Sequence, residues 1–375
     1  MIDTVVLTIP QGNFNTASNP KAANWELNSK SGNYEKYVKN QTHTQKNDGV
    51  YRPRIRVIKR GISSSLQIEF SIPKLIFSNN VDEVCEKDFE NILQTLQFRL
   101  RDFGIYIFTQ QLKSASVSAF HPSKNILLSE GYTASGIIKE LKKINLTKRM
   151  DLHRDSFRND GQSLQFYTNS HSLVIYDKMQ DLRKPKKRAI DKDQTPIQLT
   201  LFYELDQAKT KTEILRLEVR ITKKIKINGL LTKLGYQKNP TFETIFNERL
   251  CQDIVNQYWN ELVINQNLFL FDLTSNPKQI FKRLLRNNPN IKPKEAIYLI
   301  GLQQLCKDED GIRELRGYVE QQASPRTWYR TAKDMETLNK GQSQNNCHSW
   351  IKQVDSQLKA FIPLKIHNLL ITKQV

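Results

Sequence analysis

The chain has 375 residues, enough for two domains or for one large domain with an appended region. Its hydrophobic share of 38%, with 17 Phe and 13 Tyr, is sufficient for a sizeable core and argues against a wholly disordered chain. The 57 Lys and Arg exceed the 38 Asp and Glu and give a formal net charge of +19. Such an excess favours a polyanionic partner, DNA or RNA first, over a basic surface without a specific partner.

The four cysteines are far apart and show no CxxC spacing, which argues against a disulfide framework and a zinc ribbon and suits a reducing cytosol. No apolar run approaches the length of a membrane span. The first ten residues lack the features of a signal peptide and predict a strand. We therefore expect a cytoplasmic protein with no membrane partner.

The first part of the chain predicts an α+β fold, with an antiparallel-rich sheet covered by helices mainly on one face. Residues 11–48 are polar and read as a surface excursion or a ligand-dependent lid. The other expected elements follow in chain order: a hairpin of 54–60 and 65–73, a helix within 81–103 capped by Asp82, a strand ending at His121, a helix opened by Thr133 or Ser135, two strands about the turn at Asn169 and Ser170, a basic loop at about 183–196, and strands at 197–205 and 213–221.

Beyond about residue 226 the pattern becomes helical. Helices are expected within 242–264, 277–287, 294–306, 311–321 and 325–338. We place a soft boundary near 225–240, which gives a first region of residues 1–230 and a helical region of residues 231–375.

Side-chain alternation places Arg216, Glu218 and Arg220 on one face of a strand whose other face is apolar. A carboxylate in such a strand costs several kcal/mol to bury unless it is paired or bound to metal. A half-exposed Arg-Glu-Arg ladder explains the pattern equally well. Tyr176 also has two interpretations, as a residue that packs in the core or as a reactive nucleophile. His121, which precedes a proline, is either a loop residue or a metal ligand.

Four sequence blocks follow one another along the chain in this order: LQIEFSIPKLIFSNN, SAFHPSKNIL, SLVIYDKMQDL and ILRLEVRI. They resemble the blocks of phage and plasmid replication proteins of the gene II/X family, the rolling-circle initiators of filamentous phages and related elements. The resemblance covers roughly residues 1–225 by motifs and the helical remainder, to about 340, more weakly. It implies a replication-initiator nuclease fold and a catalytic domain that nicks and closes one DNA strand at an origin.

The resemblance also implies roles for individual residues. Tyr176 becomes the nucleophile, and Glu218 a ligand of Mg²⁺ or Mn²⁺. The family's acidic position in the strand before the middle helix is replaced here, so His121 is the second expected ligand, with Asp151 and His153 in reserve. Cations near the phenol would favour the phenolate and neutralise the phosphate; these are Lys178, Arg216 and Arg220. Lys124 and Asn125 would bind the DNA backbone, and Arg216 is also expected to contact DNA.

Two further segments are expected to bind DNA. The basic run with Lys186, Lys187 and Arg188 would contact phosphates, or is a solvated charge run. The helix–turn–helix at 314–338 would present Arg326 and Arg330 to a groove, or is packed by Trp328 and Met335. A host helicase and polymerase would complete replication. The competing functions are a non-catalytic DNA-binding replication or repressor protein and a metal-dependent nuclease that uses water.

Overall fold

The structure is a computed structural model that describes residues 1–16, 25–42, 45, 48–77, 79–144, 163–183, 212–266, 268–273, 276–308, 311–340 and 347–366. The described residues form a nine-stranded sheet in the order β3-β4-β5-β6-β1-β8-β11-β10-β9, and every neighbouring pair is antiparallel. Its strands are β1 (Ile2–Pro10), β3 (Trp25–Ser31), β4 (Tyr34–Lys39), β5 (Arg54–Arg60), β6 (Ser63–Ser71), β8 (Ser116–Leu127), β9 (Ser163–Tyr167), β10 (His171–Asp177) and β11 (Ile214–Ile221). A separate small sheet pairs β2 (Asn15–Thr16) with β7 (Ile105–Tyr106).

The alternation of side chains gives the sheet one apolar and one polar face. On β1, Val5, Leu7 and Ile9 are buried while the residues between them are partly exposed. The register carries this division across the sheet, because Val5 pairs with Phe70 on β6 and with Phe120 on β8. Burial of this apolar face in one contiguous core is the main stabilising term of the fold.

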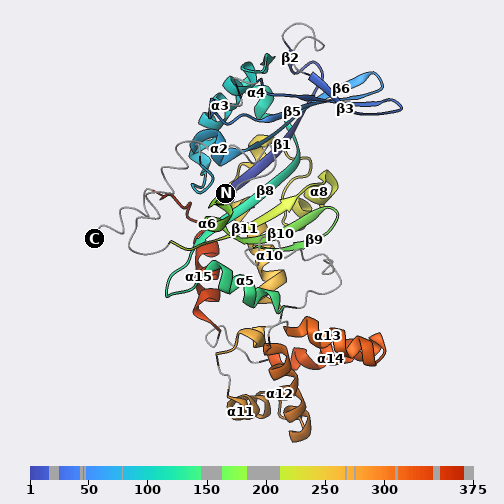
Figure 1. The fold of residues 1–375 in the computed structure, drawn as a ribbon, viewed down its shortest axis with the longest axis vertical. Helices are drawn as coiled ribbons and strands as arrows, with labels where there is room; N and C mark the ends of the chain where they lie inside the picture. Colours follow the sequence, from blue (N-terminus) through green and yellow to red (C-terminus); the bar gives the residue numbers. More distant parts are fainter. Residues whose placement is uncertain are drawn as a thin grey trace, which may run out of the picture.

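Helices before residue 265 cover the sheet and its margins (Figure 1). Helices α2, α5, α8 and α10 contact the strands directly, and α3 packs its buried leucines into the same core. Their bounds are α2 (Ile72–Phe77), η1 (Glu86–Asp88), α3 (Phe89–Arg101), α4 (Thr109–Lys113), α5 (Ala134–Lys142), α6 (Lys178–Arg183), α8 (Lys224–Lys233), α9 (Phe242–Ile245), α10 (Glu248–Trp259) and the π-helix η3 (Asn260–Ile264).

The remaining helices form a bundle at the end of the molecule away from β3 (Figure 1). They are η4 (Leu268–Phe271), α11 (Pro277–Asn287), α12 (Pro293–Lys307), α13 (Gly311–Gln322) and α14 (Pro325–Asn339). The chain then returns to the sheet, because α15 (Ser349–Ala360) packs against β8 and α10. No helix in the described ranges is both long and apolar enough to cross a membrane.

The α+β class, the large antiparallel sheet and the helical C-terminal region agree with the sequence predictions. The hairpins β5–β6 and β9–β10 and the helix opened by Thr133 also form as expected. The basic loop from residue 184 onward, the strand expected at 197–205, and Asp151 and His153 lie outside the described residues.

Three local predictions were wrong. The strand expected to end at His121 continues to Leu127, so His121 lies within it. Asp82 does not cap the following helix; its Oδ1 accepts a hydrogen bond from the Ile366 amide (2.7 Å), and α3 begins at Phe89 after the short η1. Part of the polar stretch 11–48 is β-structure, since β3 and β4 extend the sheet as an edge hairpin whose residues are all at least partly exposed.

Candidate active site

The candidate site lies on the polar face of the sheet, where β8, β11 and β10 are adjacent. Tyr176 pairs with Arg216 and Val174 pairs with Glu218, so Tyr176 and Glu218 are diagonal neighbours on one face. Ser123 of β8 pairs with Glu218 from the other side. Alternation along β8 brings His121, two residues from Ser123, to this same face. The strand arrangement therefore unites the predicted nucleophile with both predicted metal ligands.

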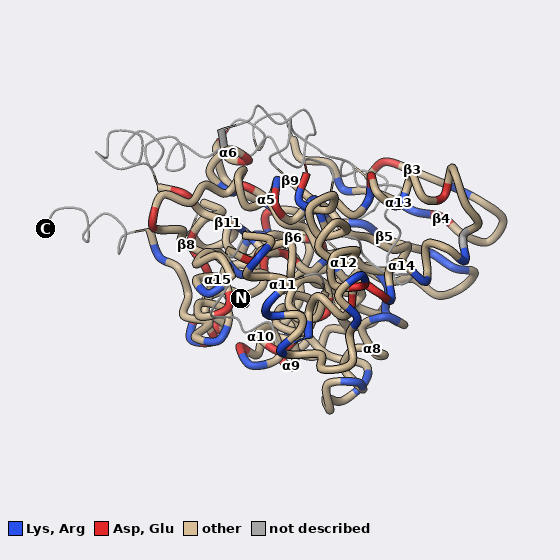
Figure 2. Tube along the Cα trace, turned by 90° about the horizontal axis from the view of Figure 1, so that it is seen from below, with Lys and Arg blue, Asp and Glu red and all other residues tan. Residues whose placement is uncertain are grey.

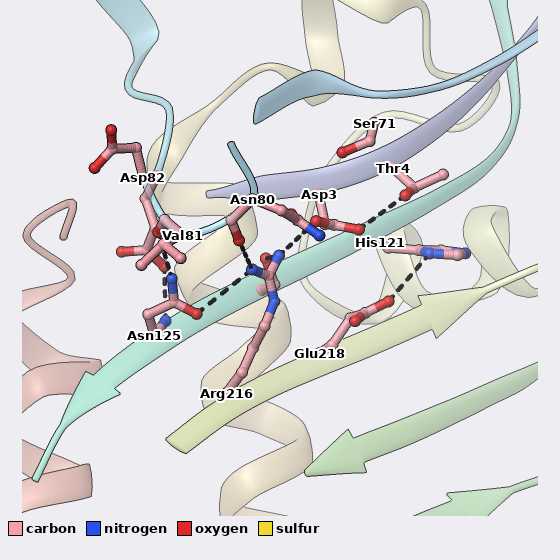
Figure 3. Close-up of polar contacts among 12 residues, drawn as sticks. Asp3, Thr4, Ser71, Asn80, Val81, Asp82, His121, Asn125, Arg216 and Glu218 are labelled. Atoms are coloured by element: carbon pink, nitrogen blue, oxygen red, sulfur yellow. Dashed lines mark hydrogen bonds and ion pairs between the residues drawn. The ribbon is translucent and has the colours of Figure 1, made fainter. Parts of the chain in front are cut away.

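Glu218 is the centre of the cluster, and only 2% of its surface is exposed. The Tyr176 hydroxyl donates to Glu218 Oε2 at 3.1 Å. Arg220 Nε donates to Oε1 at 2.8 Å, and its Nη2 lies 3.4 Å from Oε2. His121 Nδ1 is 3.3 Å from Oε1, a contact drawn in Figure 3. Both carboxylate oxygens of Glu218 are thus engaged by groups that could take part in catalysis.

Exposure is uneven across this cluster. Tyr176 is 9% exposed as a residue, whereas the side chains of His121 and Arg220 are 18% and 36% exposed. His121 and Arg220 are therefore the most exposed members of the cluster, whereas Tyr176 and Glu218 are buried beneath them.

The protonation states follow from burial and from the neighbouring charges. Burial raises the pKa of Tyr176 well above its ordinary value of 10.0, the nearby Glu218 raises it further, and Arg216 opposes the shift. Burial alone would also raise the pKa of Glu218, but Arg220, His121 and Arg216 hold it well below its ordinary value. At neutral pH the pair is therefore a protonated phenol donating to a carboxylate.

Arg216 belongs to a second, largely buried cluster on the same face. Its Nη2 donates to Asp3 Oδ1 at 2.7 Å (Figure 3). The same nitrogen donates to Ser123 Oγ at 2.9 Å. Although burial alone would raise the pKa of Asp3, Arg216 holds it below its ordinary value. With its amide oriented to satisfy both neighbours, Asn80 donates to Asp3 Oδ1 (2.9 Å) and accepts from Lys178 Nζ (3.1 Å).

Lys178 is completely buried, with its Nζ 5.7 Å from the centre of the Tyr176 ring. This position is within the range of a cation–π contact with the face of the phenol. The structure therefore brings together the three predicted catalytic residues Tyr176, Lys178 and Arg220. Lys178 lies over the phenol ring, and Arg220 pairs with the carboxylate of Glu218.

The predicted DNA contacts Lys124 and Asn125 are buried and held by Glu83. Lys124 Nζ donates to Glu83 Oε2 (2.5 Å) and to the Ile362 carbonyl (2.9 Å). The backbone N–H of Asn125 donates to Glu83 Oε1 (2.7 Å), and the side-chain Nδ2 of Asn125 donates to the Val81 carbonyl. Because a phosphate cannot reach enclosed groups whose polar atoms are already paired, the structure assigns Lys124 and Asn125 to the scaffold and corrects the prediction.

The same correction applies to Arg216, which was expected to contact DNA. It is 2% exposed, and its guanidinium is directed into the protein toward Asp3. It can influence the site only through the electrostatic potential at Tyr176 and Glu218.

Sequence reasoning missed Asp3 and Glu83, the acidic residues that neutralise Arg216 and Lys124. Asp3 interrupts the pattern of apolar residues at alternate positions of its strand, and this interruption could have identified it from the sequence. Glu83 lies in the 79–85 segment, which no periodic pattern marks. Its carboxylate joins that segment to β8 and to the Leu364 amide (2.8 Å), and no local signal predicts such a contact.

The expected divalent metal has two donors here, His121 and Glu218. Within the described ranges no cluster of three or more His, Cys, Asp or Glu side chains could hold a metal ion. Mg²⁺ commonly uses one or two protein carboxylates and completes its shell with water and substrate phosphate. The 3.3 Å between His121 Nδ1 and Glu218 Oε1 would suit two adjacent ligands of one ion, but Oε1 also accepts a hydrogen bond from Arg220 Nε at 2.8 Å, so a metal ion here would have to displace that contact.

The expected recognition helix is α14; its packing interpretation is confirmed, whereas the insertion of its other face into a DNA groove stays a prediction. Trp328 and Met335 are buried against the bundle, while Arg326 and Arg330 are exposed. Lys186, Lys187 and Arg188 lie outside the described residues. Figure 2 shows other Lys and Arg residues along β4, β5 and α11, so positive charge is not confined to the candidate site.

No protein-family model, no curated protein and no solved structure matches this chain.

Proposed function

We propose that the protein initiates rolling-circle DNA replication by nicking and closing one strand at an origin, with Tyr176 as the nucleophile. The observation that carries the proposal is the hydrogen bond from the Tyr176 hydroxyl to Glu218, at 3.1 Å, on a polar sheet face also occupied by His121 and Arg220. The net charge of +19 and the resemblance to gene II/X replication proteins support DNA as the substrate.

The residues suit a transfer of the strand to the enzyme. Tyr176 Oη attacks a backbone phosphorus as the bond from phosphorus to the 3′ oxygen breaks. The phenol proton is relayed through Glu218 Oε2, which already accepts its hydrogen bond, to water and on to the leaving 3′ oxygen, so that Glu218 remains the carboxylate that its lowered pKa favours. The product is a 5′-phosphotyrosyl linkage and a 3′-hydroxyl that a polymerase can extend.

The cations around the phenol support this step. Arg216 lowers the cost of charge on Tyr176, and Arg220 is the most exposed cation of the cluster, placed to pair with the phosphate. A bound Mg²⁺ or Mn²⁺ at His121 and Glu218 would supply charge to the phosphate oxygens. Because the tyrosyl linkage retains the phosphodiester energy, the reverse reaction can close the circle after synthesis.

A second candidate is a DNA-binding replication or repressor protein without catalysis on the same fold. It is favoured by the low exposure of Tyr176 and by the engagement of both Glu218 oxygens, which are features of a structural hydrogen-bond network. In this reading, Tyr176 and Glu218 stabilise the packing of β10 on β11.

Supercoiled plasmids carrying the DNA around the coding sequence separate these functions. Nicking and relaxation with Mn²⁺ or Mg²⁺ that is lost in Tyr176→Phe, and kept in Tyr167→Phe on the neighbouring strand β9, supports the tyrosine mechanism. Relaxation that survives Tyr176→Phe indicates a nuclease that uses water. Sequence-specific binding without relaxation indicates the non-catalytic protein.

A further inference from the structure

Helix α12 carries an apolar stripe on its outer face that no described part of the chain covers. Ile297 is 63% exposed and Leu305 is 54% exposed, and Tyr298 beside Ile297 is also exposed. Positions 297, 298, 301 and 305 follow helical spacing and share one face. The opposite face is buried through Ala296, Leu299, Leu302 and Cys306, so α12 is apolar on both sides.

Gly301 lies at the centre of the stripe. A Cβ at this position would meet no atom within 4 Å among the described residues. Glycine within a helix costs about 1 kcal/mol relative to alanine, and no described neighbour requires a glycine here. A small residue in the middle of an exposed apolar stripe allows the backbone of a second helix to approach closely.

The stripe is complementary to itself when two copies of α12 run antiparallel about Gly301. Four positions before and after the glycine are Ile297 and Leu305, so apolar side chains face each other across the pair. Seven positions before and after it are the exposed residues Lys294 and Asp308, whose charges are opposite. Neither Lys294 nor Asp308 forms an ion pair among the described residues. A two-fold axis at Gly301 would therefore create two ion pairs at the ends of one apolar contact.

We propose that the protein forms a two-fold symmetric dimer through antiparallel contact of α12 with α12 of a second copy. An isologous contact of this kind uses one surface twice, and opposite charges at its ends set the direction of the helices. The contact is one helix wide and about 22 Å long, at 1.5 Å per residue for 15 residues. Because it is smaller than a standard interface, we expect a weak and reversible dimer.

Cross-linking of the full chain tests the two-fold axis. In the proposed dimer residue 301 faces its own copy, so Gly301→Cys forms a disulfide-linked dimer under mild oxidation. The matched control is Gly317→Cys on α13, another helical glycine with no atom within 4 Å of an added Cβ. Comparable cross-linking of both variants would overturn the proposal.

Sedimentation velocity with charge-exchanged variants tests the direction of the pair. Lys294→Asp places like charges together at both ends and should weaken dimerisation at least about tenfold. Adding Asp308→Lys restores opposite charges and should return the dissociation constant to within about threefold of the original. A chain that stays monomeric at about 100 µM, or a dimer indifferent to Lys294→Asp, contradicts the proposal.

A third readout distinguishes this surface from a DNA-binding surface. Each variant is also titrated with a labelled DNA duplex, and its fold is checked by thermal melting. If Lys294→Asp weakens DNA binding but leaves self-association unchanged, α12 contacts DNA and the dimer proposal fails. These outcomes do not depend on whether Tyr176 is catalytic.

Discussion

At the scale of single residues, three buried charges of the sheet are each held by an opposite charge: Glu218 pairs with Arg220, Arg216 with Asp3, and Lys124 with Glu83. Glu218 stood out because a carboxylate interrupts an apolar strand, and strand alternation correctly placed it with Arg216 and Arg220. The exposure of these groups could not be predicted. Arg216 and Lys124 are enclosed because Asp3 and Glu83 neutralise them, and those partners lie 213 and 41 positions away.

The Glu83–Lys124 pair gives a stability prediction. Lys124→Met leaves Glu83 buried without its ammonium partner and should lower the free energy of unfolding by about 3–5 kcal/mol. In the double variant Lys124→Met, Glu83→Gln, the glutamine keeps one acceptor oxygen and carries no charge. The loss of unfolding free energy in this variant should therefore be smaller than the sum of the losses in the two single variants. Urea denaturation of the four proteins measures this coupling. Additive losses would show that the two side chains do not interact.

His171 gives a prediction for pH. Burial, with a smaller effect of Lys226, lowers the pKa of His171 from its ordinary 6.5 to about 4. Between these values the unfolded chain binds the proton and the folded chain does not, so stability falls as pH decreases from 6.5 toward 4. His171→Gln should reduce this loss relative to the unmodified protein, measured as the melting temperature at pH 7.5 and pH 5. Equal pH dependence in both proteins would refute the assignment.

At the scale of elements, long amphipathic helices were predicted best, and the exposed polar strands at the edge of the sheet were predicted worst. The spacing of buried residues in α3, α5 and α10 identified these helices, whereas β3 and β4 were missed. Both faces of this edge hairpin are at least partly exposed, so it lacks the apolar alternation that marks a half-buried strand. The end of β8 was misplaced because the polar residues Ser123, Lys124 and Asn125 are buried by distant partners.

The start of α5 separates two capping candidates that the sequence left open. Thr133 Oγ1 accepts the Gly136 amide at 3.1 Å, whereas the Ser135 hydroxyl only approaches Thr133 at 3.4 Å. Thr133→Ala should therefore cost about 1 kcal/mol of stability, and Ser135→Ala should cost much less. Chemical denaturation of both variants provides the measurement. A larger loss of stability for Ser135→Ala than for Thr133→Ala would show that Thr133 is not the N-cap.

Helix α14 gives a prediction about DNA affinity. If its exposed face contacts phosphates, the double variant Arg326→Gln, Arg330→Gln should reduce the slope of log affinity against log salt by about 2. The control Lys282→Gln, Arg286→Gln removes the same charge from the exposed face of α11. Fluorescence anisotropy with one DNA duplex gives both slopes. Equal slopes in the two double variants would mean that α14 acts only through net charge.

At the scale of the whole molecule, the fold explains how residues from distant segments form one site. The sheet order places β8 beside β11 and β11 beside β10, although residues 128–170 lie between β8 and β10 in the chain. The sequence predicted the strands but not this order, because pairing is decided by burial across the whole sheet and not by local pattern. The return of α15 to β8 was missed for the same reason.

The proposed function requires that Tyr176 become covalently joined to DNA. Mass spectrometry of the protease-digested protein, after reaction with supercoiled DNA from around its coding sequence and Mn²⁺, tests this step directly. We expect a nucleotide adduct on the peptide that contains Tyr176, absent in Tyr176→Phe and strongly reduced in Glu218→Gln. DNA that is nicked while Tyr176 remains unmodified, or an adduct on another tyrosine, would contradict it.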